Sequence, residues 1–458
     1  MGRMTKSLLV GLVGIGLLGQ QVFAVGSGGY TNQAAGAKAF GQGNAFAARS
    51  DDASASTFNP AGLTQLNANE LSLGLTLQTP FISYQTTAGE KDRAKNLSFT
   101  IPNFYLALKP GQQKWVVGLG VTSPFGLGTE WRDTSPLRYV ATRSDLNLVN
   151  INPNFAYQIN SDLSVGVGVD YFNSYRIRME KQLSVGLLNY AISGDLADLH
   201  NIAKGQSSLI GRGDGWGYNL GLLYRTCESH SLGLTFRSPV KVKYEGDVKM
   251  SGLGYSGPTG TDMTGYSSRE IFGGKDYSDK VSSEFTYPAV ATLGYAIKAS
   301  DSWLWELDVE WTGWAAFQEM QINYAETDPY RLAILNSGNP TPKEWKNVFS
   351  AALGTEYILA NNLALRSGYS FWDTPVPTKT FEPSTPDSDV HGLALGFGYP
   401  WDDFSIDFGY QFLYFTRRTV ENTVGAYIDP STGTQINPVN GKYLVSNSSY
   451  ALNFNYKF

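Results

Sequence analysis

The last nine residues, Tyr450-Ala-Leu-Asn-Phe-Asn-Tyr-Lys-Phe458, alternate strictly between apolar and small or polar side chains. Successive side chains of a β-strand point to opposite faces, so every second residue from Tyr450 to Phe458 shares one apolar face. A strand with one apolar and one polar face suits a wall between lipid and a water-filled lumen. The stretch therefore predicts a terminal strand of a membrane barrel.

The same alternation recurs through the chain and divides it into about 14 strands. Tight connections alternate with longer polar ones along the whole length, which is typical of a barrel with short periplasmic turns and long external loops. The sequence thus predicts an all-β fold, a transmembrane antiparallel β-barrel with both ends on the periplasmic side. The predicted strands lie near residues 70–84, 96–108, 114–125, 145–158, 163–178, 213–225, 231–245, 281–297, 303–323, 345–358, 363–371, 391–399, 404–420 and 442–458.

The composition agrees with a barrel and excludes several other classes of protein. Charged residues are 16% of the 458 residues, aromatic residues 13%, and 50 are glycine. The mean hydropathy of −0.21 argues against a bundle of membrane helices, and the net charge of −5 against nucleic-acid binding. Cys227 is the only cysteine, and the three histidines are far apart in sequence. We therefore predict no catalytic set, no metal, no cofactor and no enzymatic activity.

The N-terminal region is predicted to contain a cleaved signal peptide and a segment that plugs the barrel. Residues 1–24 resemble a bacterial signal peptide, because basic residues precede the apolar run Leu8–Gly19 and Val22-Phe-Ala24 suits cleavage. A membrane anchor is the alternative, although the run is short for a span. Residues 25–65 are rich in Gly and Ala, so they either extend into the periplasm or fold into the lumen. Residues 66–458 are assigned to the barrel.

The segment Asp51-Asp-Ala-Ser-Ala-Ser-Thr-Phe-Asn-Pro-Ala61 resembles the N-terminal hatch of the FadL-type outer-membrane transporters. The resemblance assigns the hatch motif to Asp51, Asp52, Asn59, Pro60 and Ala61. Further segments follow in family order, namely Pro124–Glu130, Asn150–Tyr157, Leu163–Gly168, Asp214–Gly221, Arg237–Lys241, Glu310–Trp314, Asp373–Pro377 and Pro386–Asp389. The terminal Phe458 resembles the assembly signal of bacterial outer-membrane proteins.

This resemblance implies a fourteen-stranded barrel in the bacterial outer membrane that takes up hydrophobic compounds, such as long-chain fatty acids or aromatic and aliphatic hydrocarbons. In the family, ligand is captured among external loops, enters a lumenal pocket, and leaves sideways through a gap beside a kinked third strand. The implied partners are a hydrophobic small molecule, outer-membrane lipid, lipopolysaccharide and the barrel-assembly machinery, with the protein itself a monomer.

The third strand contains an interruption that suits such a gap. Strand alternation continues to Val121, and then Ser123-Pro-Phe-Gly126 interrupts it, so the kink and opening are predicted within Gly118–Gly126, with Gly118 and Gly120 among their residues. Pro124 has no N–H to donate to a ladder, and Gly126 relaxes the backbone, so Ser123, Pro124, Phe125 and Gly126 favour a break in pairing. The alternative is that Pro124 already belongs to the external loop.

Two further sets of residues are candidates for ligand contacts. Leu188, Ile192, Leu196 and Leu199 share one helical face in an external loop, which suits a capture groove or, alternatively, packing of the loop on itself. Basic pairs at the upper ends of two strands could receive a ligand carboxylate or could face lipopolysaccharide at the rim; they are Arg176, Arg178, Lys241 and Lys243. Trp303, Trp305, Trp311 and Trp314 are interpreted as girdle or lipid-facing aromatics.

Three functions remain open from the sequence. A transporter of hydrophobic compounds predicts a plugged lumen, an apolar pocket and ligand specificity. A general diffusion porin predicts an open, charged lumen with steady ion conductance. An adhesin or structural barrel predicts no ligand dependence.

Overall fold

The structure is a computed structural model that describes the chain except for residues 1–27, 185–203, 254–271, 273–275, 423–426 and 429–434. The predicted signal peptide (1–24) and the predicted capture residues Leu188, Ile192, Leu196 and Leu199 therefore lie outside the described residues.

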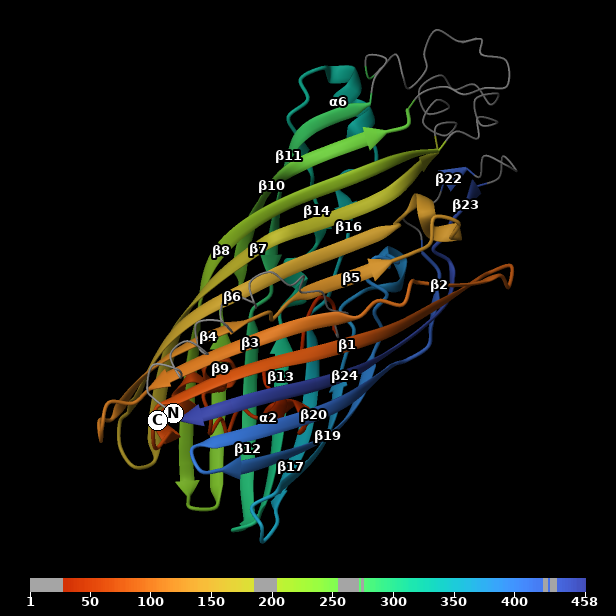
Figure 1. Cartoon of the computed structure of the whole chain (residues 1–458). Coiled ribbons are helices and arrows are strands. Elements are labelled where there is room, and N and C mark those ends of the chain that lie inside the picture. Colours follow the sequence, from red (N-terminus) through yellow and green to blue (C-terminus); the bar gives the residue numbers. More distant parts are fainter. Residues whose placement is uncertain (1–27, 185–203, 254–271, 273–275, 423–426, 429–434) are drawn as a thin grey trace, which may run out of the picture.

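Fourteen antiparallel wall strands form one closed barrel, which confirms the predicted fold class (Figure 1). Three of the fourteen are interrupted and carry two labels each. In chain order the strands are β1 (Glu70–Thr86), β3 (Phe99–Leu108), β4 (Trp115–Thr122) with β5 (Gly126–Glu130), β6 (Arg143–Gln158), β7 (Leu163–Ser184), β8 (Lys204–Cys227), β9 (His230–Arg237) with β10 (Val240–Ser251), β11 (Tyr277–Tyr287) with β12 (Val290–Ser300), β13 (Trp303–Thr312), β17 (Val348–Ile358), β18 (Ala364–Trp372), β19 (Val390–Trp401), β20 (Phe404–Phe415) and β24 (Gly441–Lys457).

The remaining described elements are short. The long connections contain β2 (Lys91–Arg93), η3 (Pro136–Tyr139), η5 (Trp314–Ala316), β14 (Glu319–Met320), β15 (Asn323–Tyr324), α6 (Pro329–Leu335), β16 (Thr341–Pro342), η6 (Thr378–Thr380), β21 (Arg418–Val420), β22 (Tyr427–Ile428) and β23 (Gln435–Ile436). The N-terminal segment contains α2 (Ala37–Phe40), α3 (Ala55–Phe58) and η2 (Pro60–Gln65).

The barrel closes where the first strand pairs with the last. The β1–β24 register runs from Glu70 opposite Lys457 to Thr86 opposite Gly441. The backbone N–H of Phe458 donates to the carbonyl of Asn69 at 3.0 Å, one residue beyond this ladder. Closure pairs the first strand with the last, so neither leaves an open edge to lipid, which offers no hydrogen-bond partners.

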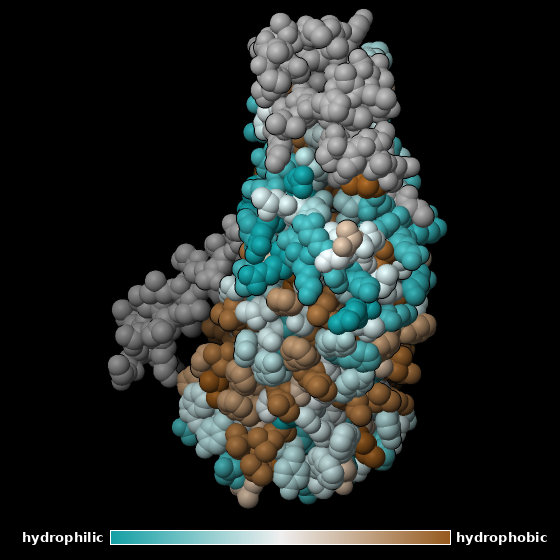
Figure 2. All heavy atoms as spheres, turned by 90° about the vertical axis from the view of Figure 1, so that its right-hand side faces the viewer, coloured by the Kyte–Doolittle hydropathy of each residue, from teal (hydrophilic) through white to brown (hydrophobic). Residues whose placement is uncertain are grey.

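The outer surface carries the apolar face that the alternation predicts. Leu75, Leu77, Leu293 and Leu395 are among the large hydrophobic side chains that the barrel exposes. Hydrophobic residues gather over the lower part of the barrel in Figure 2, below a more hydrophilic region. Within the described residues, none of the helices has the length and hydrophobicity needed to cross a membrane.

Strand lengths differ from the sequence prediction mainly at the rim with the long connections. β7 and β8 extend to Ser184 and from Lys204, so they replace much of the predicted loop at 179–212. The predicted strand 303–323 instead ends at Thr312, where Gly313 bends the chain. Trp314 consequently turns inward and is 1% exposed, so its interpretation as a girdle residue was wrong.

We predict that Phe458→Ala slows assembly of the barrel but leaves the finished barrel as stable as before. The Phe458 side chain is 53% exposed, and among the described residues its ring stacks on Tyr456 alone, at 5.6 Å between centroids. Its loss therefore removes little packing, whereas a terminal aromatic read by the assembly machinery would be missed. Heat-modifiable gel mobility over time in the presence of that machinery would measure the rate.

Phe454→Ala is the matched control for this prediction, because Phe454 lies on the same face of β24 and is 51% exposed. We expect it to assemble at the normal rate. Equal rates for both variants would contradict a specific role for the terminal residue.

Candidate functional site

Residues 28–69, here called the lumenal segment, lie inside the barrel and touch strands around its whole circumference (Figure 1). α2 packs against β19, β20 and β24, α3 against β4 and β6, and η2 against β4, β6, β7 and β8. Its buried residues are mostly small, as at Ala37, Ala45 and Ala55, which have no exposed surface. Small side chains let this backbone come close to the wall.

The Asn59-Pro60-Ala61 motif positions η2 at the wall. The side-chain oxygen of Asn59 accepts the Ala61 N–H at 3.2 Å, which caps η2. The side-chain nitrogen of Asn59 donates to the carbonyls of Ala47 and Leu222, at 2.8 and 3.1 Å. The motif therefore ties two parts of the lumenal segment to β8.

Inward-facing glycines of the wall make room for the lumenal segment. A Cβ added to Gly368 would lie 2.2 Å from the carbonyl carbon of Gln42, and one at Gly233 would lie 2.1 Å from the oxygen of Ala47. Similar conflicts occur at Gly166, Gly221, Gly354 and Gly396, on four further strands. The wall is thus shaped to the backbone of this segment, which accounts for part of the high glycine content.

Two carboxylates of β13 bind four consecutive backbone N–H groups of the lumenal segment. Asp308 accepts from Phe46 and Ala47 at 2.8 and 2.9 Å. Glu306 accepts from Ala48 and Arg49 at 2.6 and 3.2 Å. These bonds satisfy buried donors that a small-residue turn could not satisfy itself.

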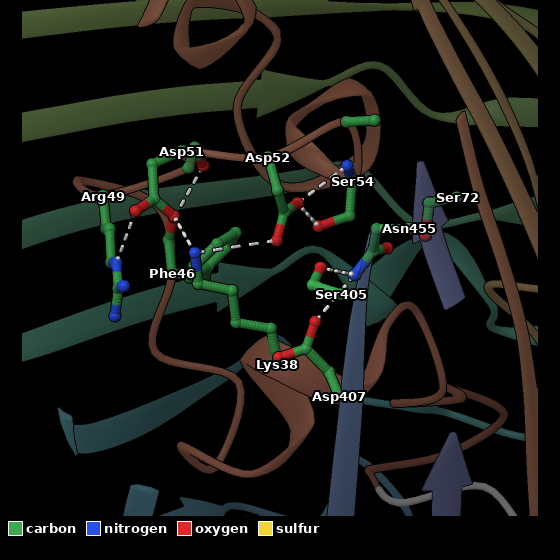
Figure 3. A network of polar contacts seen from close by, with 12 residues as sticks. Lys38, Phe46, Arg49, Asp51, Asp52, Ser54, Ser72, Ser405, Asp407 and Asn455 are labelled. Carbon is green, nitrogen blue, oxygen red and sulfur yellow. Dashed lines mark hydrogen bonds and ion pairs between the residues drawn. The ribbon is translucent and has the colours of Figure 1, made fainter. Parts of the chain in front are cut away.

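The hatch-motif residue Asp51 belongs to a buried network of ion pairs (Figure 3). Asp51 binds Lys38 at 2.7 Å and Arg49 at 3.0 Å, and Lys38 also lies 4.0 Å from Asp52. Burial by itself raises the pKa of Asp51, but Arg49 and Lys38 outweigh it and hold that pKa well below its usual range. Asp51 therefore stays charged at neutral pH.

The network continues from the lumenal segment into the wall. Arg49 binds Glu356 of β17 at 2.5 Å, and Glu356 binds Arg366 of β18 at 2.6 Å. Arg366 binds Asp407 of β20, also at 2.6 Å. Removing one member would leave a buried charge unpaired, which costs more than an intact pair contributes.

The lumenal segment also reaches the seam at which the barrel closes. The N–H of Ala37, at the start of α2, donates to the side-chain oxygen of Asn453 at 2.9 Å. The amide nitrogen of Asn453 in β24 donates to Ser72 of β1 and to Asn103 of β3. One side chain of the last strand thus joins the seam to the segment inside it.

The third wall strand is interrupted at Ser123–Phe125, between β4 and β5. β4 pairs with β3 only through residues 117–121, and above the break the described ladder of β5 runs to β6 alone. The stretch 99–103 of β3 consequently has a ladder partner on the β1 side but none on the side of the third strand. Gly118 and Gly120 lie below the break in the paired part of β4, so they do not contribute to it.

The lumenal segment pairs with the backbone of the third strand at the break. Asn32 N–H donates to the Pro124 carbonyl at 2.8 Å, and Gly126 N–H donates to the Tyr30 carbonyl at 3.0 Å. Thr31 forms an isolated antiparallel bridge with Phe125 between these two bonds. The start of the segment therefore acts as a short extra strand against the third strand.

Two of the lumenal cavities between described residues lie on opposite sides of an aromatic cluster. The lower cavity, of about 160 Å³, is lined by Thr31, Phe58 and the break, together with wall residues such as Arg237. The upper cavity, of about 80 Å³, is lined by Tyr30, by wall residues and by the long connections around Phe317, Lys343 and Glu382. Both are concave spaces with mixed apolar and polar linings, as binding sites usually are.

The aromatic cluster that separates the cavities is built from distant parts of the chain. Phe125 lines the lower cavity and Tyr287 the upper one, and their rings lie 4.8 Å apart. Tyr30 of the lumenal segment completes the cluster, with its ring 5.1 Å from that of Trp345. The other members are Phe172, Phe285, Trp314 and Phe317.

The four cations predicted for a ligand carboxylate are not brought together. Arg178 lines the upper cavity and is paired with Glu180. Arg176 lines neither cavity, and Lys241 and Lys243 are exposed. The two lysines lie near the start of β10, on its exposed face and away from both cavities.

Sequence reasoning missed Tyr30, Lys343 and Glu382, which all line the upper cavity. It also missed the carboxylates of β13, although Glu306 and Asp308 share the inward face of a strand whose other face is apolar. The feature that could have identified them is an acidic residue on the polar face of a predicted wall strand.

Comparisons with known proteins agree with this architecture. Residues 19–458 match the model of the family described as outer membrane protein transport protein (OMPP1/FadL/TodX). The long-chain fatty acid transport protein of Escherichia coli K12 is 26% identical over 459 residues, which cover 94% of this chain and 96% of that protein.

Two solved structures are similar in fold. A Pseudomonas aeruginosa FadL homologue has a TM-score of 0.77 at 16% identity, over 94% of this chain and 100% of that one. The Pseudomonas putida toluene transporter TodX has a TM-score of 0.68 at 20% identity, over 94% and 99%.

A closed barrel of fourteen strands with an apolar outer face defines an outer-membrane protein, and its location is the bacterial outer membrane. Because the family model matches nearly the whole chain, the protein belongs to the OMPP1/FadL/TodX family of outer-membrane transport proteins.

We predict that Gly368→Val displaces the lumenal segment and increases ion conductance in planar bilayers several-fold. The new side chain cannot coexist with the Gln42 backbone, whereas valine suits the strand itself. Ser367→Val is the control, because it places the same side chain on the opposite face of β18 and should leave conductance low. Low ion conductance of the Gly368→Val variant, equal to that of the unaltered protein, would contradict the packing of the lumenal segment against Gly368.

Proposed function

We propose that this protein takes up hydrophobic compounds, such as long-chain fatty acids or aromatic and aliphatic hydrocarbons, by passive diffusion between binding sites. The proposed exit is sideways, through the break of the third strand into the membrane. The main support for this proposal is a cavity that lies directly at the break, with Pro124 and Phe125 in its lining.

The arrangement of the cavities supports a stepwise route. The upper cavity is next to the long connections, the aromatic cluster follows, and the lower cavity adjoins the break. A hydrophobic molecule gains by leaving water at each of these sites, at roughly 25 cal/mol for each Å² of apolar surface buried. It gains again on entering lipid, so a lateral exit avoids the aqueous periplasm.

The lumenal segment supports the proposal by its two different attachments. From Phe46 onward it is held by carboxylates and buried ion pairs, which favours a permanent plug, the hatch proposed for residues 25–65. At Tyr30–Asn32 it is held to the break by a bridge and a few hydrogen bonds. We propose that this first part withdraws to open the gap while the rest keeps the straight route closed.

A general diffusion porin is the second candidate, and an adhesin or structural barrel the third. A porin needs an open lumen, whereas residues 28–69 fill this one with buried, hydrogen-bonded backbone. An adhesin needs no internal cavities next to a wall break. The lumenal segment and the cavities therefore favour the transporter.

A reversible cross-link tests the lateral exit. Thr31→Cys with Phe125→Cys, in a Cys227→Ser background, places two cysteines at the antiparallel bridge. Opposed residues flanked by ladder bonds have Cα atoms about 4.5 Å apart, which a disulfide can join. We expect oxidation to abolish uptake of toluene by cells, and reduction to restore it.

The single variant Thr31→Cys in the same background is the control and should transport normally under both conditions. Undiminished uptake through fully cross-linked protein would refute the lateral exit. A deletion strain that takes up toluene as fast as the complemented strain would refute the transport function itself.

A further inference from the structure

We infer that the lumenal cavities accept neutral hydrophobic molecules and reject carboxylates, with Glu382 as the residue that sets this preference by neutralising Lys343. The inference rests on the proposed transport function and narrows its substrates, at the same cavities, to neutral compounds such as hydrocarbons in place of fatty-acid anions.

Lys343 is the most buried cation at the upper cavity, and it is already paired. Its side chain is 3% exposed, and its ammonium lies 2.5 Å from a carboxylate oxygen of Glu382. Ser384 donates to the same oxygen of Glu382 at 3.3 Å. The ammonium also lies 5.9 Å from the centre of the Phe317 ring. Glu382 therefore holds the position that a ligand carboxylate would need.

A ligand carboxylate would have to displace Glu382 from Lys343 or share the lysine with it. Glu382 belongs to the same chain and is held in place, so it competes without the entropy loss of an incoming ligand. Two carboxylates at one ammonium would also repel each other in a poorly hydrated space. Both effects weaken an anionic ligand and leave a neutral one unaffected.

Arg178, the other cation at the upper cavity, is neutralised in the same way. It is paired with Glu180, whose carboxylate also accepts from Ser208 at 3.1 Å. The same cavity is lined by Asp145, which is paired with Arg143 at 2.8 Å. Among the described residues that line this space, neither cation lacks a carboxylate partner.

The lower cavity carries more acid than base. Its cation, Arg237, lies 3.4 Å from the buried carboxylate of Asp170. Asp308 and Glu310 line the same cavity; Asp308 binds backbone N–H groups, and Glu310 accepts from Thr292 and Thr312. An anion at this site would therefore meet two carboxyl groups and a single cation, Arg237, which already faces Asp170.

Dodecan-1-ol and dodecanoate are suitable probes, because they share the alkyl chain and differ in charge. We would measure equilibrium binding by calorimetry to the full protein in lipid nanodiscs, with empty nanodiscs subtracted. At about pH 8 we expect dodecanol to bind roughly tenfold tighter or more. Dodecanoate should tighten towards about pH 5, since a carboxyl group with a pKa near 4.3 becomes partly neutral there, whereas dodecanol should not change.

Glu382→Gln should convert the upper cavity into a carboxylate site. The amide keeps the size of the side chain but releases Lys343, so we expect dodecanoate affinity at about pH 8 to rise roughly tenfold. Dodecanol affinity should change less than about twofold. Adding Lys343→Met to this variant should abolish the gain, because it removes the freed cation.

Asp301→Asn is the matched control, because it releases Lys298 from an ion pair at a short turn far from both cavities. It should leave both affinities unchanged. If Glu382→Gln does not fold, the ratio of the two affinities in the unaltered protein and its pH dependence still decide the question.

Tighter binding of dodecanoate than of dodecanol at about pH 8 would overturn the inference while leaving the transport function standing. No gain in a folded Glu382→Gln variant would overturn the role of Glu382. Failure of both probes to bind, together with unaltered hydrocarbon uptake in a deletion strain, would refute the transport function itself.

Discussion

Every backbone N–H and C=O that faces lipid must find its partner within the protein, and this constraint governs the whole molecule. Fourteen strands meet it by closing on themselves, with β1 paired to β24 along their full length. The break at Ser123–Phe125 interrupts this pairing locally, and the lumenal segment supplies partners for Pro124 and Gly126 through Asn32 and Tyr30. A wall opening can exist in such a protein only where another part of the chain stands ready to cover it.

The same segment depends on charge more than on apolar packing for its position. Four consecutive backbone N–H groups bind Glu306 and Asp308, and the ion pairs beginning at Lys38 extend through three wall strands. Small residues bury little apolar surface, so hydrophobic burial alone would hold this segment weakly. Directional polar contacts restrict the segment to one position in the lumen. Glycines in the wall leave the space that its backbone occupies there.

Most of the barrel could be predicted because alternation is a local property of a strand. The fourteen strands, the short and long connections and the third-strand break follow from neighbouring residues such as Ser123-Pro-Phe-Gly126. Strand 303–323 was overestimated because Trp311 and Trp314 look alike in sequence, although one faces outward and the other closes the lumen. The hatch motif was located by resemblance, and its bonds to the wall were not predicted.

The polar side of the site resisted prediction because ion pairs join residues far apart in sequence. Lys343 and Glu382 belong to different connections, and their spacing in the sequence does not predict that they form an ion pair. Arg176, Arg178, Lys241 and Lys243 were chosen because charges were sought at strand ends. The cations that line the cavities form ion pairs with acidic residues, and these partners are known only from the folded structure.

The bond between Ala37 and Asn453 has a consequence for the order in which the molecule is built. The segment precedes β1 in the chain, yet it is gripped by β24, the strand made last. A ring cannot easily be filled once it is shut, so the segment must already be inside when the final strand docks. The pairing of β24 with β1 thereby sets an order of assembly, in which the lumenal segment enters first and the barrel closes afterwards.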